Sequence, residues 1–124
     1  MNKQIIFTPN APAPIGPYSQ AVKIDGRLYV SGQIAADLAA SQAGIQAEAR
    51  QVMVSIGEIL HAAGMNYHNI VKTTIFLKDM NDFAEVNAIY GEFFSGDYPA
   101  RETVQVSRLP KDVSVEISVV ALID

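Results

Sequence analysis

The chain has 124 residues, 49% hydrophobic and 18% charged, which is typical of one folded domain spanning residues 1–124 and unlike a disordered protein. Nine basic against 13 acidic residues give a net charge of −4, and no Lys/Arg cluster exceeds a dipeptide, so we expect no nucleic-acid partner. The absence of cysteine excludes disulfides, zinc fingers and thiolate catalysis.

The amino-terminal segment predicts neither a signal peptide nor a membrane anchor. Only three apolar residues in a row precede Thr8 and Pro9, and no segment approaches the roughly 18 apolar residues that a membrane span needs. We therefore expect a cytoplasmic protein with no membrane contact. Prolines at positions 9, 12, 14 and 17 predict an extended surface segment that leads to Tyr18.

The first half of the chain predicts a hairpin and a helix. Residues 19–33 form two alternating runs around Asp25-Gly26, a strong hairpin signal. Residues 34–44 show no clear period, so we expect a loop. A helix is predicted over residues 45–63, because apolar residues fall at 49, 52, 53, 56, 59, 60 and 63. Gly64 is expected to end it.

The second half predicts three more strands and a second helix. The strands are expected at residues 70–78, 102–108 and 113–123. The helix is expected from about Asp82 to Ser95, with Asp82 and Glu85 as a capping box and Gly96 as the stop. This order predicts an α+β fold with a single mixed β-sheet and both helices packed on one face.

The second face of that sheet also requires cover. Apolar residues point to both faces of the strands. For example, Ile75 and Leu77 face one side and Phe76 the other, and Val119 and Val120 face opposite sides. We infer that another subunit covers the face without helices.

Known catalytic signatures are missing, which leaves carboxylate, arginine and hydroxyl chemistry. The only histidines, His61 and His68, are expected in solvent, so no metal site is predicted. Glu116 lies in VSVEISVV, and its apolar neighbours must face the other side of the strand. It is either a solvated surface carboxylate or a carboxylate in a cleft, where desolvation would raise its pKa and suit it to acid–base work.

Arg101 follows the turn of Tyr98-Pro99-Ala100, and Thr103 shares its face. It is either a surface arginine or a planar fork that grips a substrate carboxylate.

Four further positions are weighed in the same way. Tyr18 is a pocket wall or core. Ser31 and Gly32 mark either a close approach of backbone to a ligand or a bulge. Asn87 shares the apolar side of the second helix with Tyr90, where a helix-to-loop hydrogen bond is the alternative to a role in the site.

Several ordered motifs together resemble the Rid family of reactive-intermediate deaminases, also called the YjgF type. They are IGPYSQAV, YVSGQI, EARQ, IVKTTIFLKDMNDFAEVNAIYGEFF, YPAR and LPKDVSVEI, and they span almost the whole chain. The resemblance implies a chorismate-mutase-like α+β subunit in a homotrimer, with ligand clefts between subunits. It implies hydrolysis of 2-imino acids, such as 2-iminopropanoate and 2-iminobutanoate, to 2-keto acids and ammonia without a cofactor.

The resemblance also implies roles for individual residues. Arg101 of YPAR would hold the substrate carboxylate, and Glu116 of VEI would orient or deprotonate the attacking water. Tyr18, Ser31, Gly32 and Asn87 match other pocket positions, and Thr103 also belongs to the implied site, at a position where many relatives carry cysteine. That departure affects the substrate range, as do Ser118 in place of a common glutamate and a loop at 34–44 without the usual Pro/Gly turn.

Two other functions compete with imine hydrolysis. A non-enzymatic protein that binds or senses small carboxylates such as 2-keto acids would use the same Arg101. Glu116 favours hydrolysis, because a carboxylate beside a bound carboxylate would weaken simple binding. RNA cleavage, attributed to some relatives, is disfavoured by the net charge of −4.

Overall fold

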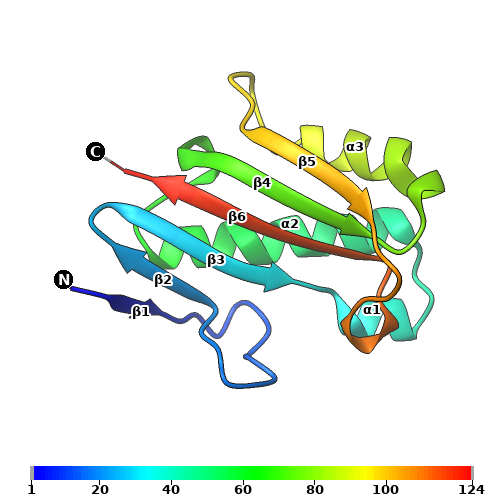
Figure 1. Ribbon diagram of the computed structural model, residues 1–124, viewed down its shortest axis with the longest axis horizontal. Helices are drawn as coiled ribbons and strands as arrows, with labels where there is room; N and C mark the ends of the chain where they lie inside the picture. Colours follow the sequence, from blue (N-terminus) through cyan, green and yellow to red (C-terminus); the bar gives the residue numbers. More distant parts are fainter. Residues whose placement is uncertain (1, 124) are drawn as a thin grey trace.

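The computed structural model describes residues 2–123 as one six-stranded sheet with helices packed on one face (Figure 1). The strands, with order β1-β2-β3-β6-β4-β5, are β1 (Gln4–Ile6), β2 (Ala21–Ile24), β3 (Arg27–Gln33), β4 (Ile70–Leu77), β5 (Ala100–Gln105) and β6 (Val115–Leu122). The helices are α1 (Ala36–Ala40), α2 (Ile45–Ala62) and α3 (Phe83–Gly91). Only β4 and β5 pair in parallel, so the predicted mixed sheet with helices on one face is confirmed.

The helix α2 forms the centre of the core, as its sequence predicts. The seven apolar positions of the predicted stripe are all buried against the sheet. The amide of Gly64 donates to His61 O and that of Met65 to Leu60 O, and Gly64 has φ +77°. This left-handed ending is the predicted glycine stop. Among residues 2–123, no helix is long and apolar enough to cross a membrane.

Two short elements were not predicted. The strand β1 pairs with β2 at the edge of the sheet, but it has only three residues, too few to show an alternating pattern. The expected loop at 34–44 is wrong in part, because Ala36–Ala40 forms α1, a helix with no buried residue. Its surface position explains why the sequence shows no apolar stripe.

The second helix is shorter than predicted and starts differently. The helix α3 ends at Gly91 rather than near Ser95, and its N-cap, Asp82, makes no side-chain capping bond. Instead, Asp79 accepts a hydrogen bond from the amide of Asn81 and begins a turn of 3₁₀ helix at Met80–Asp82. The predicted capping box is therefore wrong, because the chain enters the helix one turn earlier.

The face of the sheet without helices carries a row of apolar side chains. Ile5, Val22, Tyr29 and Val120 are neighbours across β1, β2, β3 and β6, in that order. Tyr29 is 47% exposed and Ile5 is 54% exposed. The sequence thus places apolar residues on this face as predicted, and within residues 2–123 Ile5 and Tyr29 stay about half exposed.

The turn before β6 is fixed from two sides. Glu48, on the first turn of α2, is buried and accepts a hydrogen bond from the amide of Ser114 at 3.0 Å. The carbonyl of Ser114 accepts from the amide of Lys78 at 3.0 Å. Lys111 and Asp112, just upstream, both adopt left-handed backbone conformations, with φ +56° and +54°. The buried carboxylate therefore holds Ser114, which lies between the strained residues and Glu116.

Candidate functional site

Glu116 lies over the backbone of Gly32 on the face without helices. The register between β3 and β6 shifts between Val30 and Gln33, so the bulge considered for Ser31 and Gly32 is present. A Cβ atom at position 32 would overlap the carboxylate of Glu116. Only glycine leaves room for this carboxylate at the mouth of a cavity of about 340 Å³. That cavity, here called the carboxylate cavity, is lined by Ile15, Tyr18, Ser31, Gly32, Ile34, Pro110 and Glu116.

Partial burial raises the pKa of Glu116 above the ordinary carboxyl value of 4.5. Desolvation is the cause, since removing water disfavours the charged form. No lysine or arginine among residues 2–123 forms an ion pair with it. The side chain is therefore suited to accept and return a proton nearer to neutral pH than a surface glutamate.

Tyr18 forms a wall of this cavity and is not part of the core. Its ring is 47% exposed, and its hydroxyl accepts a hydrogen bond from the amide of Ile15 at 3.2 Å. The hydroxyl of Ser31 donates to the carbonyl of Ser19, and the amide of Ser31 donates to Gln20 O at 2.9 Å. Ser31 therefore ties the segment that carries Tyr18 to β3.

Arg101 belongs to a second cavity, here called the arginine cavity, of about 500 Å³. It is lined by Asn87, Tyr90, Gly91, Tyr98, Pro99 and Arg101. The guanidinium carbon of Arg101 lies 5.0 Å from the ring centre of Tyr90 and 5.7 Å from that of Phe83. The aromatic faces stabilise the cation without neutralising it. No carboxylate among residues 2–123 pairs with Arg101, so its donors are available to an anion.

Thr103 lies on the same face of β5 as Arg101, opposite Ile75 of β4. Its hydroxyl oxygen is buried and has no hydrogen-bond partner within the described chain. Buried polar groups are almost always paired, so an unpaired hydroxyl beside a free guanidinium indicates a missing ligand or neighbour.

Asn87 is exposed on α3 and lines the arginine cavity. The alternative was a hydrogen bond from the Asn87 side chain to a loop. Within residues 2–123 the side chain makes no such bond.

Tyr90, which supports Arg101, was not singled out as a site residue from sequence. The sequence shows that Tyr90 lies on the apolar side of the helix, but it does not show the strand pairing that places β5 beside this residue.

Arg101 and Glu116 do not meet within one chain. Arg101 pairs with Thr73 of β4, whereas Glu116 pairs with Phe76 of the same strand. Positions 73 and 76 have opposite parity, so the two side chains leave the sheet on opposite faces. The chain therefore carries two half-sites: an anchor for an anion on one face and a desolvated carboxylate on the other.

Metal chemistry has no ligand set here. No group of three or more His, Asp or Glu side chains within residues 2–123 could hold an ion. His61 and His68 are both exposed, as expected.

Comparison with known proteins identifies the family. The family model described as Endoribonuclease L-PSP matches residues 8–123. The chain belongs to this family, the Rid or YjgF family. A RutC family protein of Synechocystis is 50% identical over 128 residues, 99% of this chain and 98% of that protein. A 2-iminobutanoate/2-iminopropanoate deaminase of Mus musculus is 48% identical over 123 residues, 97% of this chain and 91% of that protein.

The fold agrees with that of solved relatives. The structure of Escherichia coli TdcF with bound serine superimposes with a TM-score of 0.87 at 40% identity, covering 98% of this chain and 99% of that one. The chain thus shares both sequence and fold with the Rid family along almost its whole length.

Two threonines on neighbouring strands provide a matched test of the unpaired hydroxyl. Thr73 Oγ1 accepts a hydrogen bond from the buried hydroxyl of Tyr90 at 2.9 Å, whereas Thr103 Oγ1 has no partner. Thr73→Val should lower the free energy of unfolding by about 1–3 kcal/mol, because it strands the tyrosine hydroxyl. Thr103→Val should change it by less than about 0.5 kcal/mol or raise it. Urea unfolding measures both, and an equal loss in the two variants would show that Thr103 is paired.

Proposed function

We propose that the protein hydrolyses 2-imino acids of the 2-iminopropanoate and 2-iminobutanoate type to 2-keto acids and ammonia. The observation that carries the proposal is the pair of half-sites: an unpaired arginine on an aromatic support, and a desolvated carboxylate held over a glycine. The first suits the carboxylate of an imino acid and the second suits its attacking water. The name of the mouse relative and the serine bound to TdcF support a small substrate that carries a carboxylate.

The proposed site is assembled between copies of this chain in a homotrimer. Arg101 lies on β5, an edge strand, while Glu116 lies on the open face near the middle of the sheet. An edge strand of one copy can approach the open face of the next, and three such head-to-tail contacts close a ring. The exposed apolar row of Ile5, Val22, Tyr29 and Val120 supports burial of that face.

Each residue of the proposed site then has one role. The guanidinium of Arg101 binds the substrate carboxylate through two parallel hydrogen bonds, and Thr103 lies two residues further along the same face of β5. Glu116 of the neighbouring copy faces C2 of the imine. Tyr18, Ser31, Gly32 and Asn87 shape the walls.

The proposed reaction needs only proton transfers. Water attacks C2, the imine electrons move to nitrogen, and Glu116 carries a proton from the water to that nitrogen to give a carbinolamine. Glu116 then takes the hydroxyl proton and passes it to the amino nitrogen, the C–N bond breaks, and the hydroxyl oxygen becomes the carbonyl of the 2-keto acid as ammonia leaves. Proton transfer by a positioned side chain contributes about 10²–10⁴-fold, which suffices for an imine that already hydrolyses in water.

Activity is tested with imines that an amino-acid oxidase generates from L-alanine, with catalase removing peroxide and semicarbazide trapping free imine. The protein should lower semicarbazone formation, and Arg101→Ala and Glu116→Gln should each lower kcat/KM by about 10²-fold or more.

The parent's kcat/KM should fall toward acid pH as Glu116 becomes protonated, with a midpoint above 4.5 because burial raises the pKa of this group.

A parent that binds 2-keto acids but leaves the imine untouched would instead indicate a carboxylate sensor. Variants at Arg101 and Glu116 as active as the parent would refute the assigned roles.

Gly32 offers a test of the carboxylate position that leaves both charged residues in place. In Gly32→Ala the added methyl group collides with the end of the flexible Glu116 side chain, so the fold should persist while the carboxylate moves. A displacement of about 1 Å can cost about 10²-fold in rate, and we expect kcat to fall by that order with KM little changed. Full activity of Gly32→Ala would show that the contact with Glu116 does not matter. Gly64→Ala, at a helix end with open space around it but with φ +77°, should lower stability without touching the cavity, so it is the control for an effect of lost stability on activity.

A further inference from the structure

A third cavity opens beside the carboxylate cavity and continues it. It has a volume of about 160 Å³ and shares four lining residues with the carboxylate cavity: Ile15, Tyr18, Gly32 and Ile34. The shared walls make it the natural continuation of the space in front of Glu116. The methyl group of 2-iminopropanoate would leave most of it empty, so a larger side chain can extend into it.

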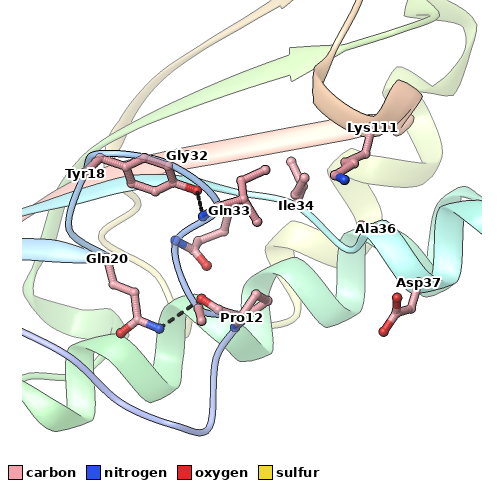
Figure 2. A pocket seen from close by; sticks show the side chains of 11 residues that line it. Pro12, Tyr18, Gln20, Gly32, Gln33, Ile34, Ala36, Asp37 and Lys111 are labelled. Carbon is pink, nitrogen blue, oxygen red and sulfur yellow. Dashed lines mark hydrogen bonds between the residues drawn. The ribbon is translucent and has the colours of Figure 1, made fainter.

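The wall of the cavity carries a hydrogen-bond acceptor. Gln33 is only 5% exposed, and its Nε2 donates to the carbonyl of Ser31 at 3.2 Å. That bond leaves Oε1 as the free end of the amide, and Figure 2 shows the amide in the space between Tyr18 and Pro12. An acceptor open to a cavity favours a ligand that brings a donor.

Two charged side chains stand at the outer side of the same cavity. Lys111 comes from the strained turn before β6, and Asp37 comes from α1. They form no ion pair with each other, and in Figure 2 they lie on either side of Ala36, with the lysine amine near Ile34. The rim therefore offers a cationic donor and an anionic acceptor.

This arrangement selects among side chains by charge. A terminal carboxylate would be attracted by Lys111 but repelled by Asp37 and Gln33 Oε1, and a terminal amine would be attracted by Asp37 but repelled by Lys111, so neither charge is favoured by all three residues. A wholly apolar end would leave the amide of Gln33 without water or partner. A neutral end that both donates and accepts, such as a carboxamide, satisfies all three residues.

We propose that this cavity receives the side chain of the substrate and that it favours 2-imino acids ending in a carboxamide. Gln33 accepts from the amide nitrogen, and Lys111 donates to the amide oxygen. This inference rests on the proposed hydrolysis of imino acids and adds the substrate class.

The test compares three imines of similar length, made by the oxidase from L-glutamine, L-glutamate and L-methionine, in the semicarbazide assay. One hydrogen bond at a partly exposed site corresponds to roughly a fivefold effect, so kcat/KM for the glutamine imine should exceed that for the methionine imine about fivefold. It should exceed that for the glutamate imine by about tenfold or more.

Variants separate recognition from a general loss of activity. Lys111→Met, on the surface, should bring the glutamine-to-methionine ratio close to one, and Gln33→Met should do the same if it folds. Lys3→Met removes the same charge at an exposed position outside the cavity and should keep the parent's ratio. An equal fall on every imine in Lys111→Met would overturn the proposal.

The outcomes also separate this inference from the function on which it rests. A parent that hydrolyses 2-iminopropanoate but shows no preference for the glutamine imine overturns the substrate class alone. A parent inactive on every imine overturns both.

Discussion

The alternation of side chains along a β-strand is the constraint on which the whole account depends. Because successive residues leave the sheet on opposite faces, the register that sets Arg101 beside Thr73 and Glu116 beside Phe76 separates them by the thickness of the sheet. No rotation of either side chain can bring them together in one chain. Chemistry that needs both groups must therefore take one from each of two copies, and the uncovered apolar face gives the copies a reason to associate.

The Glu116 half-site depends on backbone features far apart in the sequence. Gly32 leaves room for the carboxylate, the bulge in β3 brings that glycine beside it, and buried Glu48 fixes the turn that precedes β6. Left-handed conformations at Lys111 and Asp112 cost roughly 1 kcal/mol or more each, so the turn persists only because its surroundings hold it. Strain kept next to two cavities agrees with a role for this turn in shaping them.

Much of the fold could be predicted from the sequence, because strong local patterns specify it. The stripe of α2, the Asp25-Gly26 hairpin and the glycine after α2 are each short-range signals with a physical cause. The short elements β1 and α1 could not be predicted, since three residues and an exposed Ala-rich turn carry no period. Arg101 and Glu116 were named from their motifs. That they lie on opposite faces of the sheet follows from how β4 pairs with β5 and β6, and the alternation of side chains within one strand does not reveal this pairing.

The central claim is that each active site takes Arg101 from one subunit and Glu116 from its neighbour. It is tested most directly by co-expressing Arg101→Ala and Glu116→Gln subunits with different affinity tags and purifying the mixed oligomers. If the site lies between subunits of a trimer, every mixed trimer contains one intact site among its three interfaces, and about one third of the parent's activity returns. If the mixed oligomers are no more active than the two inactive parents, both residues act within a single subunit or not at all, and the account is contradicted.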